Sequence, residues 1–439
     1  MSALDRFFGL TTQGTTIRTE VVAGFTTFLT MAYIILVNPA ILSQTGMPIA
    51  AVAAATCASA AFASILMGFV ANYPLALAPG MGLNAYFTFS VVKGMGLPWQ
   101  VALGCVFISG VCFLILTLVG VRQLIVNAIP KPLFAAVAAG IGLFIAFIGL
   151  KDAGIIVANP ATTVGLGDLH ASTPLLALGG LAIIAVLNAW KVKGGILVGI
   201  LVTTAIAWAL HLVAYTPQPY DLMALTATVG RLDVPGAVNI GKAGFGVLEI
   251  IFVFLFVDLF DNVGTLVAVT KRAGLMAENG SIPRLNRILT ADSIATMVGA
   301  CLGTSTVTSY IESAAGVEAG GRTGLTAIVT GLLFLGAMFF APYAQIIPAA
   351  ATAPALIIVG AMMMKPLTEI DWDDPVVALP AFLTVIGIPL TFSIANGLAF
   401  GITAYALLKL LRGKAQLGDW MLLILAGLFV VRFVYLSAS

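Results

Sequence analysis

The chain has 439 residues, of which 60% are hydrophobic and only 9% are charged, and its formal net charge at pH 7 is +2. Soluble domains carry about 25% charged residues, so this composition leaves more apolar surface than one water-facing globule can bury. It excludes an ordinary soluble protein, and the small net charge gives no indication of a nucleic-acid partner. We therefore expect an all-α protein that crosses a membrane many times and is surrounded by lipid.

Apolar segments follow one another along the whole chain. The first set lies near 20–44, 48–71, 75–92, 98–120, 132–150, 172–190 and 194–214. A polar stretch extends to about Gly244, and the second set lies near 246–270, 285–302, 305–317, 323–341, 346–364, 376–391, 394–411 and 418–436. The pattern predicts about 13 to 15 membrane segments, because 376–411 fits either one kinked segment or two. The polar connections 151–171 and 215–245 are predicted to be loops.

Positively charged residues predict the orientation of these segments, because Lys and Arg prefer the cytoplasmic side of short loops. A cytoplasmic N-terminus puts on that side Arg6, Arg18, Arg122, Lys131, Lys191, Lys193, Lys271, Arg272, Arg284 and Arg287. Residues 1–20 are polar and show no cleavable signal, so the first span is expected to act as its own insertion signal. We expect a multi-pass protein of the cytoplasmic (inner) membrane.

Two segments are too rich in Gly, Pro and hydroxyl residues for a plain membrane helix. They are YPLALAPGMGLNAYF (73–87), third in the first half, and GTSTVTSYIESAAGVEAGG (303–321), third in the second. Non-helical backbone at membrane depth survives only where it lines a protein or water-filled cavity. Matched interruptions in two halves that start on opposite sides of the membrane indicate an inverted repeat and a transporter's binding site. We expect 78–86 and 306–316 to meet as short extended pieces, each leading into a half-helix.

Three acidic residues, Asp258, Asp261 and Glu312, lie clearly within apolar or broken segments, whereas most of the 18 fall in loops. Each would cost about 2.5–3.5 kcal/mol at a helix centre facing lipid, so they must face the interior. Asp258 and Asp261 share one helix face with Thr265, and two carboxylates so close cannot cheaply ionise together, so coupled titration is expected. The alternative is a structural carboxylate satisfied by hydroxyl groups or a helix N-terminus. Asn84 is either a helix cap or a substrate contact.

Three stretches carry a resemblance to a known family. They are TEVVAGFTTFLTMAYIILVNPAIL (19–42), FDNVGTLVAVTKRAG (260–274) and GTSTVTSYIESAAGVEAGGRTG (303–324). They resemble the nucleobase-cation symporters, specifically the hypoxanthine/guanine/adenine permease branch, and the likeness covers essentially the whole chain. It implies about 14 segments in a 7+7 inverted repeat, with the third and tenth broken, and a homodimer formed through the gate domains. It also implies a core domain (1–120 and 245–341) and a gate domain (121–244 and 342–439).

The resemblance also implies where the substrate binds. In the family, substrate sits where the broken third and tenth spans meet, between a carboxylate of span eight and one of span ten. The span-eight motif corresponds to Asp261-Asn262-Val263-Gly264, and the span-ten motif to residues 310–316. Ser313 stands where the wider family has Asn, followed by one extra residue, so its role is left open.

The residues of these motifs suit a purine, whose edge alternates N–H donors with carbonyl or ring-nitrogen acceptors. Carboxylates can accept, Asn84 can donate, and Phe260 or Tyr310 can stack on the ring. Charge-assisted hydrogen bonds of this kind are about twice as strong as neutral ones. Carboxylates in a low-dielectric site also bind protons readily, which offers a route to proton coupling. The expected substrate-binding residues are Asn84, Phe260, Asp261, Thr265, Tyr310, Ile311 and Glu312, with Asp258 as the proton-coupling residue.

The expected function is therefore purine import by proton symport, with no enzymatic activity, cofactor or metal. A passive channel for a small polar solute is the main alternative, although the chain lacks a repeated filter or an acidic ring. An intramembrane aspartyl protease is disfavoured because its motif look-alikes, GLGD (165–168) and YD (220–221), lie in polar loops. The GMGLNA match (80–85) to a dinucleotide motif lacks a preceding strand. The sequence does not choose among adenine, guanine and hypoxanthine, or between proton and sodium.

Overall fold

The computed structural model describes residues 3–120, 130–213, 223, 226–238, 246–277, 281–413 and 419–436. These residues are mostly helical, with two small two-stranded sheets. Nine helices among them are long and apolar enough to span a membrane. The expectation of an all-α polytopic membrane protein is confirmed.

The first half of the chain supplies the membrane helices before the long polar connection. Its elements are α1 (Ala3–Phe8), α2 (Ile17–Met31), α3 (Ile34–Leu42), η1 (Ser43–Thr45), α4 (Ile49–Val70), β1 (Leu77–Pro79), α5 (Met81–Ala85), the π-helix η2 (Tyr86–Gly94), α6 (Trp99–Val119), α8 (Lys131–Asp152), β2 (Ile156–Asn159), β3 (Thr163–Leu166), α9 (Ser172–Ala189), α10 (Gly195–Ala209) and α12 (Val234–Val238). The apolar segment near 20–44 is thus two helices, which meet at Ala32 and Tyr33.

The second half has a corresponding series. Its elements are α14 (Gly246–Ala273), α15 (Leu285–Leu302), β4 (Val307–Ser309), α16 (Ser313–Glu318), α17 (Gly324–Ala337), η3 (Met338–Ile346), α18 (Ala349–Met362), η4 (Lys365–Glu369), α19 (Pro375–Leu390), α20 (Ile394–Leu411) and α21 (Trp420–Leu436). The region 376–411 therefore forms two helices that pack on each other. The turn between them contains Phe392, whose φ of 50° is left-handed.

The connection 151–171 is not only a loop. Strands β2 and β3 form an antiparallel hairpin within it, with Asn159 opposite Thr163. Asn159 Oδ1 accepts hydrogen bonds from the backbone N–H groups of Ala161 (2.8 Å) and Thr162 (3.3 Å). This side chain closes the turn, and β-branched residues on both sides favour strands. Within the other predicted loop, 215–245, the structure describes residues 223 and 226–238. These include the short helix α12.

The two broken segments meet as expected. Strand β1 pairs antiparallel with β4, with Ala78 opposite Thr308. The backbone N–H of Gly80 donates to the carbonyl of Thr306 (2.9 Å), and that of Tyr310 donates to the carbonyl of Ala76 (3.0 Å). Buried backbone groups at membrane depth must find protein partners, and the pairing of one half of the chain with the other supplies them.

Each strand is also held by a hydroxyl group of the second long helix in its own half. Ser64 of α4 donates to the carbonyl of Leu77 (3.2 Å) and accepts from its N–H (3.0 Å). In the second half, Thr296 of α15 donates to the carbonyl of Val307 (2.9 Å). The two halves thus use equivalent helices for the same purpose, as an inverted repeat requires.

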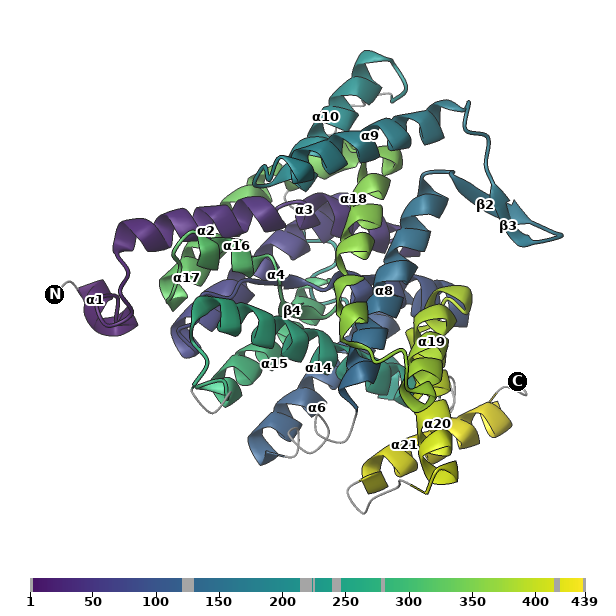
Figure 1. The fold of residues 1–439 in the computed structure, drawn as a ribbon. Helices are drawn as coiled ribbons and strands as arrows, with labels where there is room; N and C mark the ends of the chain where they lie inside the picture. Colours follow the sequence, from purple (N-terminus) through teal and green to yellow (C-terminus); the bar gives the residue numbers. More distant parts are fainter. Residues whose placement is uncertain are drawn as a thin grey trace.

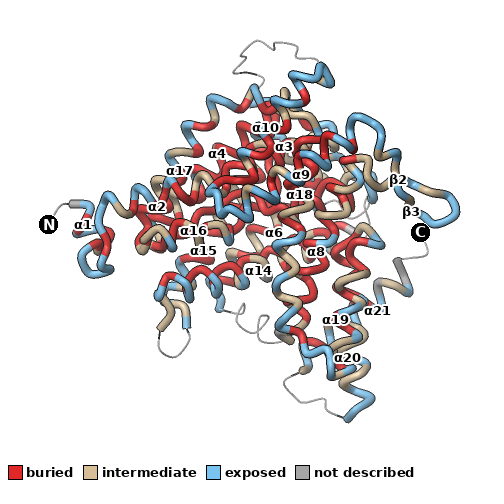
Figure 2. Tube along the Cα trace, turned by 45° about the horizontal axis from the view of Figure 1, so that its top comes forward, coloured by how far each residue is buried: buried red, intermediate tan, exposed pale blue. Residues whose placement is uncertain are grey.

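Two sets of helices surround this crossing. In one, α4 packs against α15 and α17, α2 against α16 and α17, and α6 against α14 and α15. In the other, α8 packs against α18 and α19, and α9 against α10 and α18. In Figure 1, α16 and α17 lie on the left, α8, α19 and α20 on the right, and β4 between them. Figure 2 shows that buried residues are concentrated in the middle of the bundle.

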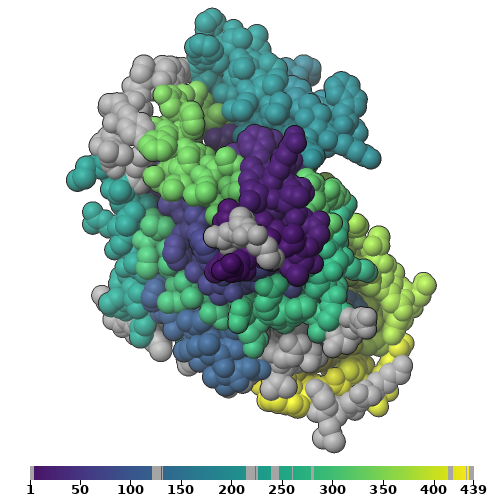
Figure 3. All heavy atoms as spheres, turned by 90° about the vertical axis from the view of Figure 1, so that its left-hand side faces the viewer, coloured from purple at the N-terminus to yellow at the C-terminus, as the bar shows by residue number. Residues whose placement is uncertain are grey.

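Helices of the two halves approach very closely in the first set. A Cβ atom added to Gly68 would lie 2.5 Å from the carbonyl oxygen of Gly324, and one added to Gly324 would lie 2.2 Å from that of Gly68. Small residues permit this backbone contact between α4 and α17. Figure 3 shows the N-terminal residues, in purple, against green segments of the second half, where α2 packs on α17.

Candidate functional site

The crossing of β1 and β4 brings acidic residues of two helices together. Asp261 lies in the middle of α14, and Glu312 lies immediately before α16. Their carboxylates are close enough to interact electrostatically, and Tyr310 interacts with both. Gly80, which follows β1, faces Asp261, because a Cβ atom added there would lie 3.8 Å from Asp261 Oδ2. The site therefore combines α14 with both broken segments.

Asp261 and Glu312 are enclosed by the fold but are only partly buried. Side chains that line a solvent-accessible space inside a helical bundle show this kind of partial exposure. Two carboxylates close enough to interact there repel when both are ionised. A proton or the N–H groups of a ligand would relieve this repulsion.

Two tyrosines fix the surroundings of Glu312. The hydroxyl of Tyr33, at the junction of α2 and α3, donates to Glu312 Oε1 (2.7 Å). The hydroxyl of Tyr310 donates to the carbonyl of Pro79 (2.5 Å), which holds its ring against β1. Tyr33 was not among the predicted site residues. A buried tyrosine in an apolar span needs a hydrogen-bond partner, and that signal could have marked it.

Amide groups contribute unused hydrogen-bond donors. Asn84 is fully buried, and its Oδ1 accepts a hydrogen bond from Ser305. Asn262 is also fully buried, and its Oδ1 accepts from Ser309 Oγ (3.1 Å). Within the described residues, the Nδ2 atoms of both side chains have no partner. Buried polar groups are rarely left unpaired, so these two amide donors are candidates for hydrogen bonds to a polar ligand.

The other predicted site residues take different positions. Asp258 and Thr265 lie one turn before and one turn after Asp261 on α14, and both are buried. Ile311 is 45% exposed beside Glu312. The side chain of Phe260 lies outside the described residues, so its predicted stacking role remains a prediction.

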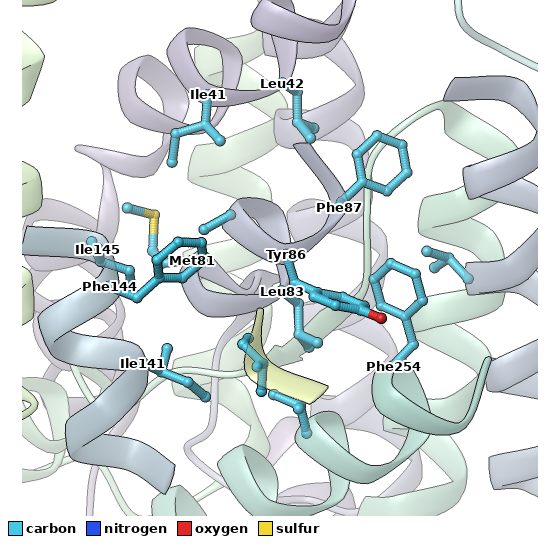
Figure 4. Packing of buried hydrophobic residues seen from close by; sticks show 14 of the residues in the cluster. Ile41, Leu42, Met81, Leu83, Tyr86, Phe87, Ile141, Phe144, Ile145 and Phe254 are labelled. Carbon is cyan, nitrogen blue, oxygen red and sulfur yellow. The ribbon is translucent and has the colours of Figure 1, made fainter. Parts of the chain in front are cut away.

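Figure 4 shows the packing beside the first broken segment. Tyr86 lies against Phe254 of α14, at 5.2 Å between ring centroids, in an edge-to-face arrangement. On the opposite side, Ile141 and Phe144 of α8 face Met81 of α5. The half-helix is thus held between α14 and α8 by apolar contacts.

The expectation that Asp258, Asp261 and Glu312 are the acidic residues inside the membrane region was incomplete, because Glu20 and Asp292 are also fully buried. The carboxylate of Glu20 accepts hydrogen bonds from the backbone N–H of Arg322 (2.9 Å) and the hydroxyl of Thr326 (2.6 Å). Glu20 therefore caps the start of α17 from the neighbouring α2. The residues that contact Glu20 lie 302 and 306 positions away in the chain, so no local sequence pattern predicts this capping role.

Ser313, whose role the sequence left open, joins the two broken segments. It is fully buried, and its Oγ accepts a hydrogen bond from the backbone N–H of Ala76 (3.0 Å). Ala76 immediately precedes β1, so this bond extends the contact between the strands to the start of α16. The side chain thus has a structural partner at this position.

Comparison with known proteins identifies the family of this chain. The model of the Permease family matches residues 18–430. The chain belongs to this family. The permease is 46% identical to the adenine permease AdeP of Escherichia coli, over 99% of this chain and 97% of that protein. It is 48% identical to the guanine/hypoxanthine permease PbuG of Bacillus subtilis, over 98% of this chain and 99% of that protein.

A solved structure shows the same fold. The transmembrane domain of the cyanobacterial bicarbonate transporter BicA matches with a TM-score of 0.67, over 86% of this chain and 97% of that chain. The sequence identity is 17%, so this likeness concerns the fold alone. The comparisons confirm the resemblance to the purine-permease branch and the polytopic fold.

Proposed function

We propose that this permease carries purine nucleobases across the cytoplasmic membrane by symport with protons. Two of its relatives are named as permeases for adenine and for guanine/hypoxanthine. The observation that carries the proposal is the pair of electrostatically interacting carboxylates, Asp261 and Glu312, beside the crossing of β1 and β4. A planar base with N–H groups on its edge is the ligand that such a pair accommodates.

The remaining groups match the other half of a purine's hydrogen-bonding edge. The Nδ2 donors of Asn84 and Asn262, which have no partner among the described residues, suit carbonyl oxygens or ring nitrogens. Tyr310 and Ile311 supply an aromatic and an apolar wall, and Thr265 supplies a hydroxyl group; stacking by Phe260 is part of the proposal. Hydrogen bonds between ligand N–H groups and a carboxylate are charge-assisted and therefore strong. The site thus offers both acceptors and donors to one flat ring.

Proton coupling follows from the cost of two neighbouring negative charges. When the site is empty, Asp261 and Glu312 are most stable if a proton is shared or if one is protonated. Asp258, one turn away and buried, is proposed as the residue whose protonation accompanies transport. No group of His, Cys, Asp and Glu in the described ranges could hold a metal ion, and we propose no metal for the mechanism.

Uptake of radiolabelled adenine, guanine and hypoxanthine tests this function, in bacterial cells that lack their own purine permeases. We expect saturable accumulation of at least one base above its external concentration. A protonophore should abolish accumulation, whereas replacement of sodium should leave it unchanged. Uptake that only equilibrates and does not saturate would instead indicate a passive channel.

We further propose that residues 1–120 and 245–341 form a core domain and that 121–244 and 342–439 form a gate domain. The two sets of packed helices support this division. A cytoplasmic N-terminus and a homodimer through the gate domain complete the proposal, based on the distribution of Lys and Arg and on the family resemblance. Movement of one domain against the other would alternate access to the site.

Contacts between these domains cluster near η1 and η2. Gln44 Nε2 donates to Asp152 Oδ2 of α8 (3.1 Å), and Lys93 Nζ, which belongs to the same proposed domain as Gln44, donates to Gln44 Oε1 (3.0 Å). Ser90 Oγ donates to the carbonyl of Phe392 (2.5 Å) in the turn between α19 and α20. If the domains move, the Gln44–Asp152 and Ser90–Phe392 hydrogen bonds must break and re-form during each transport cycle.

Cross-linking across this boundary should stop transport. We expect Gln44→Cys with Asp152→Cys, joined by a short bis-methanethiosulfonate reagent whose disulfides a reductant cleaves, to transport at less than about a tenth of the unlinked rate, because domain motion is needed for alternating access. Cleavage of the reagent should restore transport. The native Cys57, Cys105, Cys112 and Cys301 would first be replaced by Ser. Full transport by the linked protein would refute the division into moving domains.

A further inference from the structure

Tyr33 is buried at the break between two helices of the first span. It is 1% exposed and lies between the end of α2 and the start of α3. Its backbone carbonyl accepts a hydrogen bond from the N–H of Val37 (3.0 Å). The phenol is thus carried on a well-defined backbone and reaches out of its own span to Glu312, 279 residues away in the chain.

Glu312 is not held by its own helix. It occupies the position before α16, where a side chain could cap the helix, but it makes no such capping hydrogen bond. The donor that the described residues place on Oε1 is the hydroxyl of Tyr33. The first span therefore takes part in orienting the Glu312 carboxylate.

The packing of α2 on α16 makes this contact rigid. A Cβ atom added to Gly316 of α16 would lie 2.0 Å from Thr27 Oγ1 and 2.8 Å from the carbonyl oxygen of Ala23 in α2. Only glycine allows the two backbones to lie this close. Tyr33, further along the same span, consequently has little freedom relative to Glu312.

The chemistry of tyrosine suits this position. A Lys or Arg side chain would form an ion pair and neutralise Glu312, whereas a phenol donates a hydrogen bond and leaves the charge in place. A tyrosine ring has only two side-chain torsions, so little entropy is lost in holding it. The hydrogen bond from Tyr33 occupies one oxygen of the carboxylate, Oε1, and leaves its negative charge in place for a ligand.

We propose that Tyr33 is a positioning residue, which orients the Glu312 carboxylate for hydrogen bonding to the substrate. This inference rests on the proposed purine transport. It means that the first span contributes to substrate affinity, together with α14 and the two broken segments.

A double-variant cycle on the purified full-length permease tests the proposal. The measurements are the Kd of the radiolabelled base that is taken up best and thermal unfolding in detergent. Tyr33→Phe should raise the Kd by about 10- to 100-fold, the effect of losing a hydrogen bond to a charged group. The maximal transport rate should change by less than about twofold, because the chain's domain motion is untouched.

Glu312→Asp supplies the second arm of the cycle. It keeps the charge but shortens the side chain, which removes the contact with Tyr33. In this background, Tyr33→Phe should change the Kd by less than about threefold, because the interaction is already lost. Multiplicative effects would mean that Tyr33 acts independently of Glu312, which would overturn the proposal.

Tyr73→Phe is the matched control. Its hydroxyl also donates a part-buried hydrogen bond, to the carbonyl of Pro283 (2.9 Å), but away from the site. We expect it to leave the Kd unchanged and to lower thermal stability about as much as Tyr33→Phe. If Tyr33→Phe does not fold, Tyr33→Met removes the hydroxyl with an adaptable apolar side chain and should show the same loss of affinity.

The outcomes separate this role from the proposed function. A Kd for Tyr33→Phe within about twofold of the unchanged permease, or an equal loss in Tyr73→Phe, would refute the role of Tyr33 alone. Absence of purine binding by the unchanged permease would refute the proposed function and, with it, this role.

Discussion

Replacing Glu312 with Gln should weaken purine binding by on the order of a hundredfold or more, because truncating a charged partner of buried hydrogen bonds has effects of this size. Gln keeps the size of the side chain but removes its charge. Its amide would also present a donor where the ligand presents N–H groups. The Kd of the purified permease for a radiolabelled base measures the effect.

Stability distinguishes a binding role from a structural one in this variant. Removing one of two facing carboxylates relieves their repulsion, so Glu312→Gln should unfold at the same temperature as the unchanged permease or higher. Glu318→Gln is the matched control, because Glu318 ends the same helix but forms an exposed ion pair with Arg272. It should bind purine normally. Near-normal affinity in Glu312→Gln would refute a direct contact between Glu312 and the base.

Substitutions of the two aspartates of α14 should affect different steps, one purine binding and the other proton coupling. Asp261→Asn should abolish binding, because it removes one of the two interacting carboxylates of the proposed site. Asp258→Asn should still bind purine and exchange it at equal concentrations on both sides. It should not accumulate purine against a gradient, and its uptake should lose its dependence on pH, because the proposed proton carrier is gone.

Proteoliposomes with an imposed pH gradient provide the measurement. Accumulation and exchange are recorded for the unchanged permease and for both aspartate variants. If Asp258→Asn still concentrates purine with an unchanged pH profile, Asp258 is a structural carboxylate. If Asp261→Asn binds normally, the carboxylate pair is not the purine site.

The membrane class and the broken segments could be predicted because their signals are local. A run of apolar residues identifies a span wherever it packs, and Gly, Pro and hydroxyl residues interrupt a helix through their own backbone preferences. The pairing of β1 with β4 followed from this reasoning, because each unpaired segment needs a partner in a medium without water. The hairpin within 151–171 was missed, because its short strands resemble a polar loop.

The candidate site could be predicted only in part. Asp261 and Glu312 were found because charges within apolar segments are costly and therefore conspicuous. Glu20 was not found, since it lies at the boundary between the polar residues 1–20 and the first apolar segment, whereas in the structure it is fully buried and bonded to Arg322 and Thr326. Tyr33 was not found either: a tyrosine in an apolar span indicates that a hydrogen-bond partner exists, but the sequence around it does not identify Glu312 as that partner.

The sequence by itself determined that this chain is a polytopic membrane protein with two interrupted spans, because composition and backbone preference act within a few residues. Only the tertiary structure decided which groups meet. Tyr33 bonds to a residue 279 positions away, and Glu20 bonds to one 302 positions away. Such contacts depend on how helices of the two halves pack, on close approaches such as that of Gly68 and Gly324, and not on any local property of the residues themselves.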